Sequence, residues 1–156
     1  MDFSEKVAIV TGSSSGIGAA AAIGIAEGGG KIVVNYSKSE ESAANVVNQC
    51  VKAGGDAIAI KADISRDEDC RNLVSEAVLK WGRLDILVNN AGRTKFVKHS
   101  NLEGLTNHDF EEIYGLNAIG PFQLVRAARK YLSESGSGSI VNVSSVAGIR
   151  AVGSSL

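Results

Sequence analysis

The stretch KVAIVTGSSSGIG, residues 6–18, decides the fold of this 156-residue chain. Its first half is an apolar run rich in β-branched residues, typical of a buried strand, and a helical pattern follows from Ile17 to Glu27. Gly12 permits a tight turn, Gly16 lets the backbone approach a ligand closely, and Gly18 lets the helix pack against the strand. Free N–H groups at the start of such a helix attract anions. The stretch therefore predicts a strand, a phosphate-binding loop and a helix.

Outside this stretch, short apolar runs alternate with longer helical patterns. The sequence predicts further strands at residues 31–36, 56–62, 84–89 and 140–144, and further helices at 39–54, 65–81 and 107–133. Ser65 and Glu68 have the spacing of a capping box at the start of a helix. Apolar strands separated by helices indicate a parallel sheet. The expected fold class is α/β, a Rossmann-like doubly wound parallel sheet with helices on both faces.

Hydrophobic residues make up 44% of the chain and charged residues 21%, which is ordinary for a soluble globular protein. The 16 basic and 17 acidic side chains give no basic field that would attract nucleic acid. No apolar run approaches the roughly 20 residues of a membrane span, and the acidic N-terminus does not resemble a secretory signal. The sequence thus predicts a soluble, cytoplasmic protein that binds neither nucleic acid nor a membrane.

Cysteines and histidines give no sign of a disulfide or a metal site. Cys50 and Cys70 form no CxxC pair and fall in helical patterns, so free, partly buried thiols are expected. His99 and His108 are isolated, which gives no credible metal site and no context for a Ser-His-acid triad. We expect a protein without a bound metal.

Two motifs point to one family. The glycines at residues 12–18 follow the spacing G-x-x-x-G-x-G, and the strand predicted at 84–89 runs into Asn89-Asn90-Ala91-Gly92. With both motifs the whole chain resembles the classical short-chain dehydrogenase/reductase family, in particular its 3-oxoacyl-acyl-carrier-protein reductase and glucose dehydrogenase types. The resemblance implies the first five of the family's usual seven strands. It also implies hydride transfer between a nicotinamide cofactor and an alcohol or ketone, with reduction favoured.

The resemblance further implies where the cofactor lies. Asp63 corresponds to the acid that contacts the adenine amino group, Asn90 to Gly92 line the nicotinamide ribose, and Asn89 braces the central sheet. A simple loop or capping acid is the alternative for Asp63, and a glycine turn without a ligand is the alternative for the loop. The predicted cofactor-binding residues are Gly12, Ser14, Ser15, Gly16, Ile17, Gly18, Ser37, Asp63, Ile64, Asn90, Ala91 and Gly92.

The end of the second predicted strand indicates which dinucleotide binds. NAD enzymes place an acid there for the ribose 2′-hydroxyl, whereas this chain has Asn35-Tyr36-Ser37-Lys38 and no acid before Glu40. A carboxylate would repel a 2′-phosphate, while Ser37 and Lys38 could contact it. The sequence favours NADP(H), with NAD(H) as the alternative cofactor and a solvated surface charge as the alternative for Lys38.

Asn117 interrupts an apolar stripe in the helix predicted at 107–133. The stripe consists of Phe110, Ile113, Leu124 and Ala128. A buried amide without partners costs about 1–3 kcal/mol, so Asn117 needs partners or a task. Gly120 and Pro121 predict a distorted helix nearby. The resemblance implies that Asn117 is the catalytic asparagine, which helps to hold a water in a proton relay; a structural polar core residue is the alternative.

Ser144 and Ser145 follow the last predicted strand, at the end of a parallel strand where α/β sheets bind ligands. The resemblance implies that Ser145 is the catalytic serine, whose hydroxyl donates to the substrate oxygen. The family's proton donor is the tyrosine of a Y-x-x-x-K motif, which would fall just past Leu156. We therefore expect residues 1–156 to be a single NAD(P)-binding Rossmann domain, incomplete at its C-terminus.

The complete protein is expected to be longer and to form a homodimer or homotetramer. The fragment alone should be poorly soluble, because an apolar strand edge would lie uncovered. It should also be inactive, because the family's proton donor would be missing. The charges of Arg93, Lys95 and Lys98 hint at an anionic, acyl-type substrate, with solvated surface charges as the alternative. Rival interpretations are a non-catalytic dinucleotide-binding or regulatory protein and a scaffold on the same fold. Asn117 and Ser145 argue against the first, and the intact glycine-rich loop argues against the second.

Overall fold

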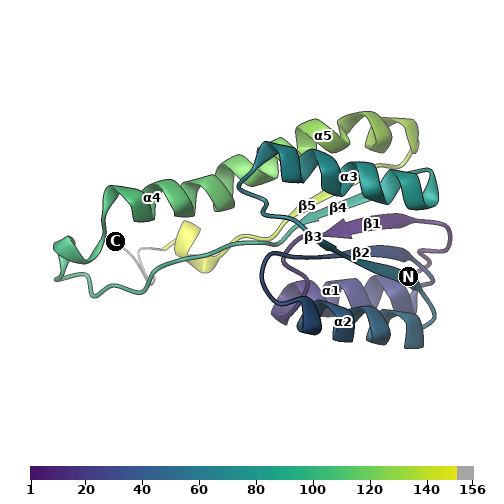
Figure 1. Cartoon of the computed structure of the whole chain (residues 1–156), viewed down its shortest axis with the longest axis horizontal. Helices are drawn as coiled ribbons and strands as arrows, with labels where there is room; N and C mark the ends of the chain where they lie inside the picture. The colour runs from purple at the N-terminus through teal and green to yellow at the C-terminus, as the bar shows by residue number, and fades with distance from the viewer. Residues whose placement is uncertain (151–156) are drawn as a thin grey trace.

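A five-stranded parallel sheet forms the centre of the molecule (Figure 1). The computed structural model describes residues 1–150. The strands are β1 (Val7–Val10), β2 (Lys31–Tyr36), β3 (Asp56–Lys61), β4 (Ile86–Asn89) and β5 (Ser139–Asn142). Their order is β3-β2-β1-β4-β5, and each neighbouring pair is parallel. The chain winds outward from β1 in both directions, which confirms the expected doubly wound fold.

Helices cover both faces of this sheet. One face carries α1 (Gly16–Glu27) and α2 (Glu40–Lys52), and the other carries α3 (Asp67–Trp81) and α5 (Gly120–Glu134) (Figure 1). In contrast, α4 (Asn107–Tyr114) extends beyond the end of the sheet. Short 3-10 turns lie at Leu102–Gly104 and Val146–Gly148. No helix in residues 1–150 has the length and apolar character needed to span a bilayer.

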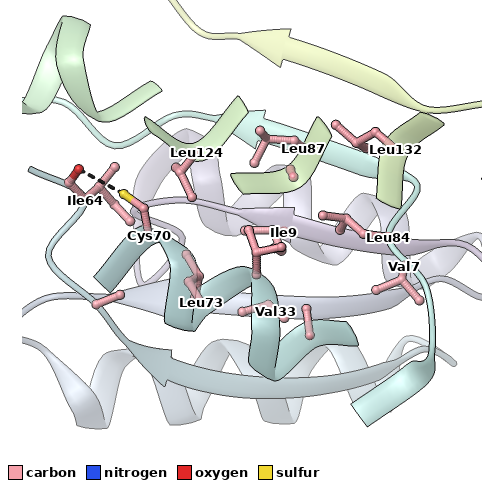
Figure 2. Packing of buried hydrophobic residues seen from close by; sticks show 14 residues of the cluster. Val7, Ile9, Val33, Ile64, Cys70, Leu73, Leu84, Leu87, Leu124 and Leu132 are labelled. Atoms are coloured by element: carbon pink, nitrogen blue, oxygen red, sulfur yellow. Dashed lines mark hydrogen bonds between the residues drawn. The ribbon is translucent and has the colours of Figure 1, made fainter. Parts of the chain in front are cut away.

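The sheet divides the core into two layers of buried apolar side chains. The layer under α3 and α5 includes Val7, Ile9, Val33, Leu73, Leu84, Leu87, Leu124 and Leu132 (Figure 2). The layer under α1 and α2 includes Ala8, Val10, Ala22, Ala26, Ile32, Val34, Val46 and Cys50. Alternate residues of β1 enter opposite layers, because successive strand side chains point to opposite faces. All of β1 is buried, so this strand firmly anchors the loop that follows it.

The start of α3 differs from the expectation. The predicted capping box of Ser65 and Glu68 is wrong, because α3 begins at Asp67 without a side-chain cap. Ser65 instead donates both its N–H and its hydroxyl to Oδ1 of Asp63, at 3.0 and 2.7 Å. A short acid two residues earlier therefore captures these groups in a local turn.

The long helix predicted at 107–133 is divided into three parts. α4 begins with a capping box, in which the Thr106 hydroxyl accepts from the N–H of Asp109 and the Asp109 carboxylate accepts from the N–H of Thr106. A π-helical segment at Gly115–Ile119 separates α4 from α5. Pro121 lies in the first turn of α5, where a missing N–H is tolerated. The predicted distortion is confirmed, and it takes the form of this π-helical segment.

Only part of the apolar stripe of this predicted helix is buried. Leu124 and Ala128 on α5 are buried, as expected, but Phe110 on α4 is 57% exposed. The expectation that Asn117 lies in the core is wrong, because this residue is exposed too. Phe110 is exposed because α4 extends past the sheet, so no strand of residues 1–150 lies beneath it (Figure 1). Asn117 lies in the π-helical segment that follows α4. The role of Asn117 must therefore be judged from its contacts rather than from burial.

β5 is shorter and more exposed than expected. It covers Ser139–Asn142 rather than 140–144, so both Ser144 and Ser145 lie beyond the strand. All four of its residues are exposed, and within residues 1–150 it pairs with β4 alone. One edge of the described sheet is therefore an open, partly apolar strand.

The two cysteines are free, and each lies in one layer of the core. Burial raises the pKa of the Cys50 thiol, and burial together with nearby acids raises the pKa of the Cys70 thiol to about 12. Both thiols therefore stay protonated and unreactive near neutral pH. Within residues 1–150, no group of histidine, cysteine and acidic side chains is arranged to hold a metal ion.

Candidate functional site

The glycine-rich loop connects the buried strand β1 to α1. Gly12 and Gly16 have φ angles of 60° and 58°, in the left-handed region that glycine adopts without strain. A Cβ atom on Gly12 would lie 2.9 Å from Cα of Ala91, so the chain after β4 approaches too closely for a side chain. Apart from its chain neighbours and the backbone of its own helix, a Cβ atom on Gly16 would meet no atom of residues 1–150 within 4 Å. The loop is closed behind Gly12 and open in front of Gly16, where a ligand can approach the backbone.

The start of α1 packs closely onto this loop and stays uncapped. A Cβ atom on Gly18 would clash with Nδ2 of Asn90 and would lie 2.8 Å from the carbonyl oxygen of Gly12. The first turn of α1 contains no acid, and the hydroxyl of Ser15 at the N-cap makes no capping hydrogen bond. The N–H groups at this helix end therefore keep their partial positive charge for an anion.

Polar and apolar side chains border the open side of the loop. Ser15 and Ile17 flank Gly16 and are exposed, and Ser14 is half-buried. Ser37 and Lys38 are exposed directly after β2, which pairs with β1. The outward surface next to the loop thus offers hydroxyl groups and an ammonium group, and no carboxylate follows β2 before residue 40.

Thr11 and Asn90 join the loop to the chain that follows β4. The Thr11 hydroxyl accepts hydrogen bonds from the N–H groups of Asn90 and Ala91, both at 2.9 Å. In return, the side-chain amide of Asn90 donates to the carbonyl oxygens of Thr11 and Gly12, at 2.8 and 3.3 Å. Thr11 is absent from the predicted site. The signal that could have identified it is a threonine placed directly between a buried strand and a glycine-rich loop.

Asp63 and Ile64 follow β3 and have different surroundings. The Asp63 carboxylate is exposed, but its Oδ1 already accepts from the N–H and the hydroxyl of Ser65. Ile64 is buried in the core layer under α3 and α5. Its carbonyl oxygen would lie 2.7 Å from a Cβ atom on Gly120, so α5 packs tightly against it. Asp63 thus stays available at the surface, whereas the Ile64 side chain belongs to the core.

Asn117 is bonded to the backbone of the chain that follows Gly92. Its Nδ2 donates to the carbonyl oxygen of Arg93 at 2.8 Å, and its Oδ1 accepts from the N–H of Arg93 at 2.9 Å. A Cβ atom on Gly92 would lie 3.4 Å from that Oδ1. The structure therefore brings Gly92 and Asn117 together, and the amide of Asn117 fixes the segment after β4.

Ser145 follows β5 and makes a separate local contact. It precedes the 3-10 turn at Val146–Gly148, and its hydroxyl accepts from the N–H of Ala147 at 3.2 Å. Ser145 is exposed, and no hydrogen bond within residues 1–150 joins it to Asn117. Because a serine hydroxyl both donates and accepts, Ser145 can still donate a hydrogen bond to a ligand.

Two of the three cations that suggest an anionic substrate form ion pairs with acids of α4. Nη1 of Arg93 lies 3.0 Å from Oε2 of Glu112, and Nζ of Lys95 lies 2.8 Å from Oδ2 of Asp109. Hydrogen bonds from Lys95 and Thr106 lower the pKa of Asp109. These ion pairs give both cations a structural partner, which weakens the hint at an anionic substrate.

Comparisons with known proteins agree with this geometry. The sequence model of the family described as short chain dehydrogenase matches residues 6–155. The chain is similar to the protein named "Granaticin polyketide synthase putative ketoacyl reductase 2" of Streptomyces violaceoruber, with 48% identity over 150 residues, 96% of this chain and 59% of the relative. It is also 43% identical over 131 residues to Elsinochrome reductase 1 of Elsinoe fawcettii. This aligned region covers 84% of this chain and 48% of that protein.

A solved structure is similar as well. The crystal structure of a short chain dehydrogenase from Burkholderia cenocepacia J2315 in complex with NADP superimposes with a TM-score of 0.90 and 36% identity. The match covers 99% of this chain and 61% of that one. The chain thus spans about half to three-fifths of the length of these relatives.

Proposed function

This chain belongs to the short-chain dehydrogenase family, and from that premise we propose that the full-length protein is an NAD(P)-dependent oxidoreductase. It transfers a hydride between a nicotinamide cofactor and an alcohol or ketone, with reduction as the favoured direction. The observation that carries the proposal is the glycine-rich loop, which is open in front of Gly16 and held from behind by Thr11 and Asn90. The relatives named as reductases and the similar structure with NADP support it.

The residues present fit a dinucleotide. Its pyrophosphate would bind the open backbone at Gly16 and the uncapped start of α1. Its adenine would lie near Asp63 and its nicotinamide ribose near Asn90 to Gly92. When bound, the cofactor supplies the hydride, and residues of this chain bind and orient it.

Within this proposal the preferred cofactor is NADP(H), with NAD(H) as the alternative. Ser37 and Lys38 are exposed after β2 and would contact the 2′-phosphate. No carboxylate stands there to repel that group.

Ser145 and Asn117 take the catalytic roles. Ser145 would donate a hydrogen bond to the substrate oxygen, because its hydroxyl is exposed and accepts only one hydrogen bond within residues 1–150. Asn117 would take part in the proton relay of the family, and its amide holds Arg93 next to the proposed ribose site.

Cofactor binding tests the proposal at the loop. We expect NADPH to bind the full-length protein more tightly than NADH, because no acid after β2 repels the 2′-phosphate. Gly16→Val places a side chain in the open space where the pyrophosphate would approach, and it should abolish measurable binding of NADPH. Fluorescence titration with both cofactors measures both effects.

Gly136→Val is the matched control. Gly136 also has a positive φ, 72°, and a Cβ atom on it would meet no atom of residues 1–150 within 4 Å, so the two changes impose similar strain on the backbone. It lies between α5 and β5 and should leave the affinity for NADPH unchanged. Normal binding by Gly16→Val would contradict the assignment of the loop. Equal affinities for the two cofactors would contradict the preference.

Turnover tests Ser145. In the full-length protein, Ser145→Ala should lower kcat by about 100-fold, as expected for the loss of a donor to a reacting oxygen. The affinity for NADPH should not change, and Ser144→Ala should retain turnover as the neighbouring control. Unchanged kcat in Ser145→Ala would overturn this role. If the protein only bound dinucleotides, the wild type and both serine variants would bind NADPH, and none of them would convert an alcohol or ketone.

The proposal extends to assembly, location and substrate. Apolar side chains are exposed from α4 to the start of α5, at Phe110, Tyr114, Ile119 and Phe122. Burial of this surface between copies would favour a homodimer or homotetramer of the full-length protein. We place the enzyme in the cytoplasm, where residues 1–156 would form its NAD(P)-binding domain. Its substrate would be a small alcohol, ketone or acyl compound.

A further inference from the structure

We propose that Asn35 is a positioning residue that fixes the phosphate-binding loop and thereby sets the affinity for the cofactor. The inference rests on the proposed function, because it concerns the same loop. Asn35 is the last residue but one of β2, and only 2% of its surface is exposed. A polar side chain buried this deeply needs partners for its amide.

The side-chain amide of Asn35 connects the ends of two other strands. Its Oδ1 accepts from the N–H of Gly12 at 3.0 Å, and its Nδ2 donates to the carbonyl oxygen of Ala62 at 3.1 Å. Gly12 begins the loop after β1, and Ala62 follows β3 directly before Asp63. One buried amide thus joins the proposed pyrophosphate site to the proposed adenine site.

The backbone of Asn35 holds the next residue of the loop. Its N–H donates to Oγ of Ser13 at 3.0 Å, and its carbonyl oxygen accepts from the N–H of Ser13 at 3.0 Å. Ser13 is itself fully buried, and its hydroxyl donates to the carbonyl oxygen of Val10 at 2.6 Å. Gly12 and Ser13 are therefore both held by Asn35, which fixes the left-handed turn at Gly12.

An amide is needed at this position, because it presents one acceptor and one donor side by side. Aspartate has the same shape, but at neutral pH it offers only acceptors, so one of its oxygens would face the carbonyl oxygen of Ala62. Alanine or serine would be too short to reach both partners. Either change would leave the turn at Gly12 without its support.

Asn35 acts on binding rather than on the chemical step. It occupies the N–H of Gly12, so this group is a fixed part of the turn and is not offered to a phosphate. The open backbone at Gly16 and the start of α1 then keep the orientation that a pyrophosphate requires. Loss of Asn35 should weaken cofactor binding and leave Ser145 and Asn117 in place.

Asn35→Asp in the full-length protein separates these effects. The Kd for NADPH, measured by fluorescence titration, should rise by at least about tenfold, because a hydrogen bond is replaced by a repulsive contact. At saturating NADPH, kcat should stay within about twofold of the wild type. Amide hydrogen exchange at Gly12, measured without cofactor, should become faster. Ser13→Ala, a smaller change at the same turn, should weaken binding in the same direction.

Val33→Ala is the matched control. Val33 lies two residues earlier on β2, on the same face of the sheet, and is fully buried, so its truncation lowers stability without touching the loop. It should change neither the Kd for NADPH nor the exchange at Gly12.

Three outcomes would overturn the inference or the function beneath it. Wild-type affinity in both Asn35→Asp and Ser13→Ala would overturn the inference alone, as would an equal loss of affinity in Val33→Ala. Failure of the wild type to bind any nicotinamide dinucleotide would overturn the proposed function. In that case the exchange rate at Gly12 would still decide whether Asn35 holds the loop.

Discussion

β2 and β5 are similar in sequence and opposite in surroundings. Both are parallel strands with a β-branched apolar run, IVV in β2 and IV in β5. β2 lies between β1 and β3 with five of its six residues buried, whereas β5 pairs only with β4 within residues 1–150 and is exposed throughout. The apolar run predicts a strand in both cases. The neighbours on each side decide how firmly that strand is held.

The same difference separates the proposed binding residues from the proposed catalytic ones. The glycine-rich loop is anchored on β1 and β2, in the covered part of the molecule. Ser145 follows β5, and Asn117 lies in the segment that extends beyond the sheet (Figure 1). Changes in β1 and β2 should therefore affect global stability. Changes in β5 or in the segment around α4 should have smaller, local effects.

The largest expected effect tests this comparison with two isoleucines. Ile32 and Ile140 are each the second residue of their strand, but Ile32 is fully buried and Ile140 is 44% exposed. Ile32→Ala leaves a cavity and should lower the free energy of unfolding by about 3 kcal/mol, whereas Ile140→Ala should cost less than about 1 kcal/mol. Urea unfolding of both variants measures the difference. Equal losses would break the comparison, because they would mean that β5 is as well covered as β2.

A second prediction concerns the polar contacts that connect the centre of the sheet to β5. Asp85 is buried directly before β4 and accepts hydrogen bonds from Arg83, Lys6 and the N–H of Val7. Its carbonyl oxygen accepts from the N–H of Ser139, the first residue of β5. Burial acts to raise the pKa of Asp85, but these hydrogen bonds outweigh it and hold the pKa below its ordinary value of 3.8.

Asp85→Asn should lower the free energy of unfolding at pH 7 by about 2 kcal/mol, because hydrogen bonds from charged donors are lost. A carboxylate with a lowered pKa stabilises the fold above its ordinary pKa, and this contribution disappears as the pH falls through the lowered value. The difference between wild type and variant should therefore shrink below about pH 4. Unfolding at pH 7 and at about pH 3 tests this. A difference that persists in acid would contradict it.

Glu5→Gln is the control for Asp85→Asn. It alters an ion pair with Lys31 in which the Glu5 side chain is 80% exposed, so it should leave the unfolding free energy unchanged within error.

The smallest expected effect compares the starts of α4 and α3. Thr106→Ala removes the cap of α4 and should cost about 1 kcal/mol, which appears locally because α4 lies in the exposed part. Ser65→Ala removes no cap, because α3 begins without one. Amide hydrogen exchange in the first turn of each helix measures both variants. Faster exchange in α3 of Ser65→Ala than in α4 of Thr106→Ala would contradict this assignment of the caps.

The stretch at residues 6–18 could be predicted because its signals are local. The apolar strand, the glycines with positive φ and the helix start depend on residues only a few positions apart. The structure confirms a strand, a loop and a helix there, and the alternation of such units correctly predicts the doubly wound sheet.

The wrong predictions concern residues whose actual surroundings could not be inferred from the spacing of residues in the sequence. Ser65 has the spacing of a cap, but Asp63 takes its hydroxyl. Asn117 has the period of a core residue, but it lies exposed in the π-helical segment between α4 and α5.

Residues that organise the loop were missed for a similar reason. The position of Thr11 before the glycine-rich loop is a local signal, but its partner Asn90 is 79 positions away. Asn35 carries no local sign of its role, because Ala62 is 27 positions away. Contacts at such separations follow only from the order of the strands.

Cys50 on α2 and Cys70 on α3 place one thiol in each layer of the core. Both residues are fully buried, so a thiol reagent reaches neither sulfur until the helix that carries it has moved away from its neighbours. The labelling rates of the two cysteines therefore report separately on the opening of the α1–α2 layer and of the α3–α5 layer. The two native cysteines thus serve as probes of local opening, one for each face of the sheet, and no reporter group has to be introduced.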